Sequence, residues 1–457
     1  MLFRQVLYHD LGCASYLLGD AGEAIVVDPR WDIAPYLEIA ESEHLRIAHV
    51  IDTHDHADHV SGRLRLARAT GARSYRPGPR EDGAGDVVMA GDEIIAGSVC
   101  LTAVATPGHR PEHLTFLVSD LSRGPGPWML LTGDSLLVGD VARPDLAVDA
   151  SEGAHLLHAS LRRLLDLDDH VEVWPAHIGG SLCGGTGLSG KSSSTIGFER
   201  RHNQLLGLDE AGFVQGVTAK LPSRPPNIER IVEINRRSGG VAPPEPALLC
   251  GDALLSRLGT GAVVLDSRVP AEFDQGHVAG SINLPVSSAG VGTRAGWALD
   301  SEASVVIVAG DEQDARRMAS ALQAVGFWQL DGVSIADLEE WRRHSVPVAH
   351  ADSWDLEQLA DGLRRRAVDL IDVREPSEWD AGHIPGSHHV PLNRLREVQS
   401  IVLPQRGRTT AVACAAGMRA AFAASLLRRA GRADVVRVAG GGIGDLGALG
   451  LELAAGA

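Results

Sequence analysis

The sequence is poor in cysteine, in basic charge and in long apolar runs. Its five cysteines, an odd number at wide spacings, do not form a disulfide framework and are typical of a reducing cytoplasm. Lys and Arg number 42 against 59 Asp and Glu, a net charge of −17, so we expect neither a nucleic acid nor an anionic membrane as partner. The chain lacks a run of 18 apolar residues and an N-terminal signal-peptide pattern. We therefore expect a cytoplasmic protein without a membrane span.

The length and composition are those of a multidomain globular protein. Hydrophobic residues make up 44% of the chain and charged residues 22%, an ordinary globular balance. At about 150 residues per domain, the length predicts roughly three domains. The stretch RRSGGVAPPEPAL (236–248) is rich in Pro and Gly, which is typical of a linker, and a second break between domains falls near 345–353. We expect domains at 1–235, 249–348 and 352–457, with a linker at 236–248.

Short apolar runs bounded by turn signals dominate the N-terminal part of the chain. Five of them have the composition of buried strands: AIVVDP (24–29), AHVIDTH (48–54), VCLTAVATPGH (99–109), PWMLLTGD (127–134) and VEVWPAH (171–177). The last four each end at a His or an Asp. Strands that carry polar side chains at their C-terminal ends indicate a site built on a rigid sheet.

The densest group of potential metal ligands follows the second of these strands. In Thr53-His54-Asp55-His56-Ala57-Asp58-His59, three His and two Asp fall within six residues. Imidazole and carboxylate groups suit zinc, iron or manganese. With only 19 His in the whole chain, such a cluster is not expected by chance. Three further candidates end later strands: His109, Asp134 and His177.

The HxHxDH motif, followed in order by Gly-His, Gly-Asp and Ala-His, resembles the metallo-β-lactamase superfamily over about residues 1–235. The resemblance implies an αββα sandwich with a metal at one edge of the two sheets. The superfamily includes lactamases, glyoxalase II-like thioesterases, nucleases and persulfide dioxygenases. The motif alone does not choose among these activities.

Two metal arrangements are open at this point. Seven ligands suffice for a dinuclear site, with Asp134 bridging one ion on His54, His56 and His109 and another on Asp58, His59 and His177. The persulfide dioxygenases, which the pattern also resembles, use one ferrous ion, and the resemblance implies His54, His109 and Asp134 as its ligands. Such a triad leaves open positions for O2 and a substrate sulfur. The other four residues would then orient the ligands and bind water by hydrogen bonds: His56, Asp58, His59 and His177.

Two residues near this cluster are candidates for substrate contact. Arg143 stands where the family places an Arg that contacts the carrier thiol, and an acidic protein needs a local guanidinium to bind an anionic thiol; a solvated loop Arg is the alternative. Cys183, six residues after His177, either hands on sulfane sulfur or is a buried inert thiol. We expect the remaining N-terminal and central cysteines to be core residues: Cys13, Cys100 and Cys250.

The C-terminal half contains an internal repeat. DSRVPAEFDQGHVAGSINLPVS (266–287) and DVREPSEWDAGHIPGSHHVPLN (372–393) share Asp, Arg, Pro, Glu, Asp, Gly, His, Gly, Ser and Pro in register. Each copy continues with an apolar strand and then a helical stretch: 305–309 and 315–327 in the first, 410–414 and 419–431 in the second. This order predicts a small α/β unit with a parallel sheet in each copy.

The second copy has the pattern of a reactive cysteine. Cys414 ends a strand and precedes a helix, so free backbone amides and the positive helix end favour a thiolate or a persulfide anion. Arg419 adds charge for an anionic substrate, and the loop between them consists of Ala415, Ala416, Gly417 and Met418. With the upstream motif, this resembles the sulfur-handling rhodanese family over about 352–457. Leu446 stands where the family usually has Trp, in a packing position.

The first copy lacks this chemistry. Alignment of the two copies places Ala309 at the cysteine position and Asp314 at the arginine position. Three acidic residues in the loop 309–314 would repel a sulfur anion. We therefore expect residues 249–348 to form an inactive rhodanese-like domain that serves as a spacer or docking platform.

The whole chain resembles the multidomain persulfide dioxygenase–sulfurtransferases of bacterial sulfide detoxification, an α/β and α+β multidomain class. The resemblance implies one Fe(II) per chain, oxidation of a low-molecular-weight thiol persulfide by O2 to sulfite, and sulfur exchange at Cys414 that forms or uses thiosulfate. It also implies frequent self-association. The main alternative is a dinuclear zinc thioesterase of the glyoxalase II type fused to a rhodanese. A rhodanese half that only docks partners is a third reading, and the intact Cys414 loop counts against it.

Overall fold

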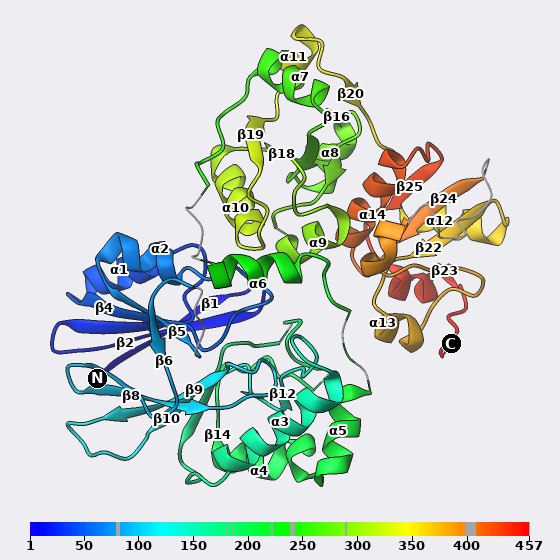
Figure 1. Cartoon of the computed structure of the whole chain (residues 1–457). Coiled ribbons are helices and arrows are strands. Elements are labelled where there is room, and N and C mark those ends of the chain that lie inside the picture. The colour runs from blue at the N-terminus through cyan, green and yellow to red at the C-terminus, as the bar shows by residue number, and fades with distance from the viewer. Residues whose placement is uncertain are drawn as a thin grey trace. The chain divides into compact units, whose positions relative to one another are not determined.

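The computed structural model of the chain describes residues 1–456 except 79–82, 180, 186, 220, 222, 238–242, 288–289 and 398–407. It divides into two units, residues 1–242 with 323–326, and residues 243–322 with 327–457 (Figure 1). Residues 238–242 of the predicted linker lie outside the described residues. Among the described residues, no helix has both the length and the apolarity needed to cross a bilayer.

The first unit is built on two six-stranded sheets. Strands of the first sheet lie in chain order: β1 (Leu2–Tyr8), β2 (Cys13–Asp20), β3 (Glu23–Val27), β4 (Arg46–Ile51), β5 (Arg73–Pro77) and β6 (Asp86–Val88). The β1–β2 and β2–β3 pairs are antiparallel, and the pairs from β3 to β6 are parallel. Strands β2 and β3 are buried on both faces, which explains their continuous apolar runs.

The second sheet has the order β14-β13-β10-β9-β8-β7. Its strands are β7 (Glu93–Ala96), β8 (Val99–Ala105), β9 (Leu114–Asp120), β10 (Met129–Gly133), β13 (Glu172–Pro175) and β14 (Ser194–Thr195). Only the β10–β13 pair is parallel within this described sheet. A short hairpin, β11 (Leu136–Leu137) with β12 (Asp140–Val141), follows β10.

Helices cover the outer faces of both sheets (Figure 1), and the inner faces of the two sheets share one core. Tyr16, Leu101 and Phe116 belong to that inner core. Helices α1 (Ala34–Ser42) and α2 (Arg63–Thr70) pack on the first sheet. Helices α3 (Ala150–Leu164) and α5 (Glu210–Thr218) pack on the second. The predicted αββα sandwich is therefore confirmed; the unit also contains α4 (Ile196–His202), η1 (Gln204–Gly207) and α6 (Ile228–Arg237).

The second unit contains the two copies of the repeat. The first copy has a parallel sheet in the order β17-β15-β18-β19, with β15 (Val263–Asp266), β17 (Ile282–Asn283), β18 (Val305–Ala309) and β19 (Leu330–Ile335). A separate two-stranded antiparallel sheet pairs β16 (His277–Val278) with β20 (Val348–Ala349). The helices of this copy are α7 (Gly251–Gly259), α8 (Pro270–Gln275), α9 (Val291–Ala298), α10 (Glu312–Gln323) and α11 (Leu338–Arg343).

The second copy has a parallel sheet in the order β21-β25-β24-β22-β23. The strands are β21 (Ser353–Trp354), β22 (Val368–Asp372), β23 (His388–His389), β24 (Thr409–Ala413) and β25 (Val435–Val438). The helices are α12 (Leu356–Arg364), α13 (Pro376–Ala381), η2 (Leu392–Glu397), α14 (Met418–Arg429) and η3 (Ile443–Leu449). Both copies therefore have the predicted strand–loop–helix order.

The loop before α10 differs from its prediction. The helix was expected from residue 315, and it begins at Glu312, inside the acidic loop. The reason is local, because Asp311 Oδ1 accepts a hydrogen bond from the Asp314 amide at 2.8 Å and so caps the first turn. The acidic residues of the first copy therefore have a structural role at a helix start.

Candidate metal centre and cysteine loop

The metal-ligand candidates of the first unit lie on four loops that follow strands. His54 follows β4, His109 follows β8, Asp134 follows β10 directly, and His177 follows β13. Each of these side chains is at most 1% exposed. Strand β4 belongs to the first sheet, and β8, β10 and β13 belong to the second. The sandwich therefore brings together residues that are far apart in sequence.

Three of these residues meet with their ligand atoms close together. Asp134 Oδ2 lies 3.3 Å from His109 Nε2 and 3.8 Å from His54 Nε2. Within the described residues, all three atoms are buried and have no hydrogen-bond partner. Buried polar atoms without partners are costly, so this arrangement indicates a cation-binding site. Two imidazoles and one carboxylate are a suitable donor set for a transition metal.

The protonation of the two imidazoles suits metal binding. His109 Nδ1 donates a hydrogen bond to the Arg143 carbonyl oxygen at 2.8 Å, which leaves the lone pair on Nε2. His54 Nδ1 lies 2.9 Å from Thr53 Oγ1, which in turn donates to the Asp28 carboxylate. Burial lowers the pKa of both histidines, most strongly for His54, and so favours the neutral form that binds a metal.

Both the main chain and the side chain of Asp134 form hydrogen bonds that fix its position. Its amide donates to His113 Nε2 at 2.8 Å, and burial lowers the pKa of His113 to about 3, which keeps that acceptor neutral. The preceding Gly133 has φ +51, and a Cβ there would lie 2.6 Å from His113 Nε2 and 2.8 Å from Thr53 Oγ1. Packing around the site therefore requires a glycine before Asp134.

A second group of possible ligands adjoins the first: His56, Asp58 and His59. Its carboxylate is already engaged, since Asp58 Oδ1 lies 3.0 Å from His59 Nδ1 and Asp58 Oδ2 lies 2.8 Å from His177 Nε2. His177 Nδ1 contacts Asp134 Oδ1 at 2.6 Å, so His177 bridges two carboxylates. Burial alone would lower the pKa of His177, but Asp134, Cys183 and Asp58 raise it well above its usual value.

Two cysteines lie beside this cluster. Cys13 Sγ is 3.2 Å from Asp58 Oδ2 and 3.4 Å from His177 Nε2, so it is buried, as expected of a core residue, but against polar groups. The ligand atoms of Cys183, Asp134 and His177 lie within 4.8 Å of one another. Burial, aided by the charge of Asp134, raises the pKa of the Cys183 thiol to about 12. Cys100 is a core residue as predicted. Cys250 is exposed at the start of α7, so its assignment to the core was wrong.

Arg143 is buried beside the cluster with its guanidinium directed at a neighbour in sequence. It forms two hydrogen bonds with Asp145, at 2.7 and 2.9 Å. Asp145 also binds Arg224 at 2.8 Å. Arg143 therefore contributes to the site through its carbonyl, which orients His109, and a contact of its guanidinium with substrate stays a prediction.

A residue of α6 fastens the histidine loop. Asn235 is 8% exposed, and its Nδ2 donates to the carbonyl oxygens of both His56 and His59 at 2.9 Å. Its Oδ1 accepts from the Ser61 amide at 2.8 Å. The adjacent Arg236 binds Asp55 at 3.0 Å. These contacts hold residues 55–61 in place from a helix far along the chain.

Sequence reasoning missed several of these residues. Asp28 was seen only as the end of a strand, although its Oδ1 accepts from the Thr53 amide at 2.6 Å and lies 3.1 Å from His56 Nε2. His113 had a usable signal, since it lies four residues after His109 and directly before an apolar run. Asn235 had none, because a lone Asn in an amphipathic helix is ordinary.

In the second unit, Cys414 lies between β24 and α14 and is 2% exposed. Its Sγ accepts a hydrogen bond from the Gly417 amide at 3.1 Å. Gly417 has φ +86 at the helix N-cap, a conformation that favours glycine. Behind the loop, a Cβ on Gly442 would lie 2.0 Å from the Ala415 carbonyl oxygen, so the loop rests directly on the backbone before η3.

Arg419 is oriented by an acidic residue of α13. Its two terminal nitrogens donate to the two oxygens of Glu378 at 2.5 and 2.7 Å. The hydrogen bonds of Arg419 lower the pKa of Glu378 despite partial burial. The guanidinium that we expect to contact an anion is thus held by a carboxylate, in the geometry that suits a planar fork.

Two protein families match this chain, one in the first unit and one in the two copies of the repeat. The family described as the metallo-beta-lactamase superfamily matches residues 9–177. The family described as the rhodanese-like domain matches twice, over residues 251–344 and 355–445. The second family match therefore includes both copies of the repeat, the one without the cysteine as well as the one with it.

Two relatives and one solved structure are similar to parts of this chain. The chain is 31% identical to the mitochondrial persulfide dioxygenase ETHE1 of Homo sapiens, over 53% of this chain and 91% of that protein. It is 29% identical to a hydroxyacylglutathione hydrolase of Methylobacillus flagellatus, over 43% and 71%. A crystal structure of a metallo-beta-lactamase from Staphylococcus aureus aligns with a TM-score of 0.66 and 29% identity, over 74% of this chain and 99% of that one.

Proposed function

The chain belongs to the ETHE1 family of persulfide dioxygenases within the metallo-beta-lactamase superfamily and carries two rhodanese-like domains, and from this we propose that it oxidises a low-molecular-weight thiol persulfide with O2 and exchanges sulfane sulfur at Cys414. The metal centre would perform the oxidation and the cysteine loop the sulfur transfer. The fusion keeps the shared intermediate at a high local concentration.

The oxidation has a defined balance. One persulfide, one O2 and one water give the free thiol, hydrogen sulfite and a proton. The sulfane sulfur loses four electrons, and O2 takes up all four. The reaction therefore needs no further oxidant or reductant.

The observation that carries the proposal is the buried triad of His54, His109 and Asp134, whose three ligand atoms lack hydrogen-bond partners among the described residues. We assign the metal to this triad and propose that it is one ferrous ion. When bound, such an ion supplies the redox chemistry for O2 activation and open positions for substrates. His113 and the Arg143 carbonyl hold Asp134 and His109 in place, and Asp28 fixes Thr53 beside His54.

The sulfur transfer would use Cys414 as nucleophile. Its thiolate takes the terminal sulfur of a persulfide, which breaks the S–S bond of that persulfide, forms a new one on Cys414 and releases the carrier thiol. Sulfite then attacks the terminal sulfur, so that thiosulfate leaves and the Cys414 thiolate is restored. Arg419, fixed by Glu378, would attract the sulfite or thiosulfate anion. The reverse direction uses thiosulfate as donor.

A dinuclear zinc hydrolase is the second candidate. The group of His56, Asp58 and His59 favours it, as does the similarity to a hydroxyacylglutathione hydrolase. The hydrogen bonds of Asp58 to two imidazoles count against it, because no oxygen of that carboxylate remains without a partner. A cytoplasmic location and self-association stay predictions.

Metal content and oxygen uptake test the proposal together. We would purify the full chain without oxygen, determine its metals, and record oxygen uptake on addition of glutathione persulfide. One iron per chain with rapid uptake is the expected result. Two zinc ions per chain without uptake would overturn the dioxygenase assignment and favour a hydrolase. Coenzyme A persulfide as a second substrate would compare carrier thiols.

A further inference from the structure

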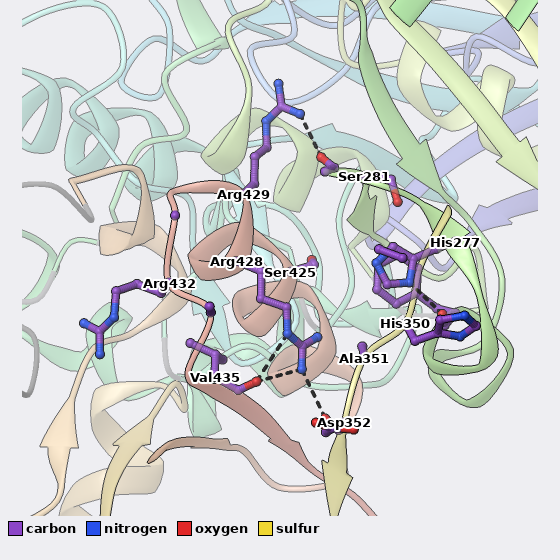
Figure 2. Close-up of a pocket in the computed structure, with 15 residues that line it drawn as sticks. His277, Ser281, His350, Ala351, Asp352, Ser425, Arg428, Arg429, Arg432 and Val435 are labelled. Atoms are coloured by element: carbon purple, nitrogen blue, oxygen red, sulfur yellow. Dashed lines mark hydrogen bonds between the residues drawn. The ribbon is translucent and has the colours of Figure 1, made fainter. Parts of the chain in front are cut away.

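The copy of the repeat without a cysteine contacts the helix that follows the Cys414 loop. Strand β17 of the first copy packs against α14 of the second. Ser425 Oγ accepts a hydrogen bond from the Asn283 amide at 3.0 Å, and Arg429 Nη1 donates to the Gly280 carbonyl oxygen at 2.8 Å (Figure 2). Both copies also line a cavity of about 370 Å³ at this contact (Figure 2). The first copy is therefore placed to act on the loop before α14.

A largely buried ion pair also joins the two copies. Arg437 on β25 of the second copy donates through Nη2 to Asp274 Oδ2 on α8 of the first copy, at 2.6 Å. The side chain of Arg437 is 8% exposed and that of Asp274 is 12% exposed. A guanidinium so far removed from water depends on its carboxylate partner, so Asp274 fixes the position of Arg437.

The Arg437 guanidinium lies against the cysteine loop with its other terminal nitrogen. A Cβ built on Gly417 would lie 3.7 Å from Arg437 Nη1 and 3.4 Å from the Val438 carbonyl oxygen. The Gly417 amide in turn donates a hydrogen bond to Cys414 Sγ at 3.1 Å. A continuous path of contacts therefore runs from Asp274 of the first copy, through Arg437 and Gly417, to the sulfur of Cys414.

Arg437 is bonded less completely than an arginine of the repeated motif. Arg374 donates through both Nε and Nη2 to Asp372, and its Nη2 also donates to the Gly382 carbonyl oxygen. Among the described residues, Arg437 reaches its carboxylate through Nη2, and its Nε is buried without a hydrogen-bond partner. A buried donor without a partner is costly, and such departures are expected where a side chain serves a site. The position of Arg437 beside Gly417 is thus kept at the expense of its own hydrogen bonds.

We propose that the first copy supports the cysteine loop of the second, with Asp274 and Arg437 as positioning residues for the Cys414 thiol. The proposal rests on the sulfur transfer proposed above. In that reaction, negative charge develops on Cys414 Sγ when its bond to the outer sulfur breaks, and the Gly417 amide stabilises this charge only at hydrogen-bond distance. The copy without a cysteine is then more than a spacer, because it holds the loop of the active copy in place.

Three variants of the full chain and one control test this support. Arg437→Gln removes the guanidinium beside Gly417. Asp274→Asn removes the charge but keeps an acceptor for Arg437, and the double variant shows whether the two residues act as one unit. Glu272→Gln is the matched control, because it removes a carboxylate charge from the same helix at an exposed residue outside the pair.

We expect the kcat of thiosulfate:cyanide sulfur transfer to fall about tenfold in Arg437→Gln and about threefold in Asp274→Asn, since a displaced amide stabilises the charge on sulfur less well. The KM for thiosulfate should change less than about twofold, because Arg419 is unaltered. The double variant should match Arg437→Gln, and Glu272→Gln should match the wild type. Oxygen uptake should be the same in all of them.

Amide hydrogen exchange of residues 414–419, followed by mass spectrometry, measures the support directly. Exchange in this segment should become about tenfold faster in Arg437→Gln, because the loop opens more often without the guanidinium. Segments of the first unit should exchange as in the wild type. Melting curves show whether the variants fold, and Asp274→Asn carries the same tests if Arg437→Gln does not.

Three results would each overturn the proposal. They are a wild-type kcat in the variants, wild-type exchange of residues 414–419, and effects of the two substitutions on kcat that multiply in the double variant. A wild-type chain without any sulfurtransferase activity would instead contradict the proposed transfer at Cys414. The exchange measurement would then decide alone whether Asp274 and Arg437 hold the loop.

Discussion

Asn235 is one of the residues that fix the position of the histidine loop. A single amide side chain binds three main-chain groups of that loop, and all three bonds are 2.8–2.9 Å long. The loop has no regular secondary structure to hold it, so each such bond counts toward its rigidity. Ligand loops that are not held in advance bind metal more weakly, because ordering them costs conformational entropy.

We therefore expect Asn235→Ala to lower the metal affinity of the full chain about tenfold or more without removing a ligand. Competition with a chelator measures the affinity, and circular dichroism tests the fold. Gln215→Ala is the control, because Gln215 is exposed and lies on a different helix, α5. Equal metal affinity of wild type and Asn235→Ala would contradict the role of Asn235.

Asp145 makes the stability of the first unit depend on pH. Burial alone would raise its pKa, but the hydrogen bonds and charges of Arg143 and Arg224 lower it to about 2. A carboxylate whose pKa is lower in the folded state stabilises the fold above its unfolded pKa of about 3.9. That contribution decreases as the pH falls through this value toward 2.

Asp145→Asn imitates the protonated acid, so we expect it to lower the free energy of unfolding by about 1–2 kcal/mol at pH 7. The difference from wild type should shrink at pH 3. Urea unfolding at both pH values measures it. Asp86→Asn is the matched control, because the Asp86–Arg73 pair is exposed and solvent screens its attraction, so this variant should unfold like the wild type at both pH values. A difference independent of pH would contradict this assignment.

At the scale of elements, the Asp, Arg, Gly and His positions of the repeated motif turn out to be structural. Arg268 binds Asp266 and the Gly276 carbonyl, and Arg374 binds Asp372 and the Gly382 carbonyl in the same way. Phe273 of α8 stacks on His277 in the first copy, with ring centroids 3.7 Å apart. Trp379 of α13 stacks on His383 in the second copy, with ring centroids 3.8 Å apart. Both copies keep these residues because both need the same turn.

The sequence predicted the strands that precede functional residues better than the loops themselves. The strands at 305–309 and 410–414 match β18 and β24 to within a residue, because apolar runs bounded by turn residues are strong local signals. Cys13 was assigned to the core from its place beside an apolar run. Its contact with Asp58 and His177 depends on sheet pairing across the sandwich, which local pattern does not contain.

The support of the Cys414 loop by η3 gives a prediction at this scale. A Cβ on Gly442 would lie 2.0 Å from the Ala415 carbonyl oxygen and 2.7 Å from that of Cys414, so Gly442→Ala must displace the loop. We expect thiosulfate:cyanide sulfurtransferase activity to fall at least tenfold, while oxygen uptake at the other centre is kept. Gly444→Ala, with no atom within 4 Å of its Cβ, is the matched control. Full transferase activity in Gly442→Ala would show that the loop does not depend on this contact.

At the scale of the whole molecule, the two proposed reactions share sulfite. The dioxygenase reaction alone uses one persulfide for each O2 and leaves sulfite. With Cys414 in place, a second persulfide gives its sulfane sulfur to that sulfite, so two persulfides are used for each O2 and thiosulfate is formed. The ratio of persulfide to O2 therefore reports whether the two halves of the chain act on one substrate pool.

We expect the wild type to consume two persulfides per O2 and to form thiosulfate, and Cys414→Ala to consume one and to accumulate sulfite at the same rate of oxygen uptake. An oxygen electrode and chromatography of the sulfur anions measure both. Cys250→Ala is the control, since this exposed cysteine lies at the start of α7 and not in the Cys414 loop. A ratio that stays the same in Cys414→Ala would mean that Cys414 takes no part in persulfide turnover, and the rhodanese half would then serve a separate sulfur-transfer reaction.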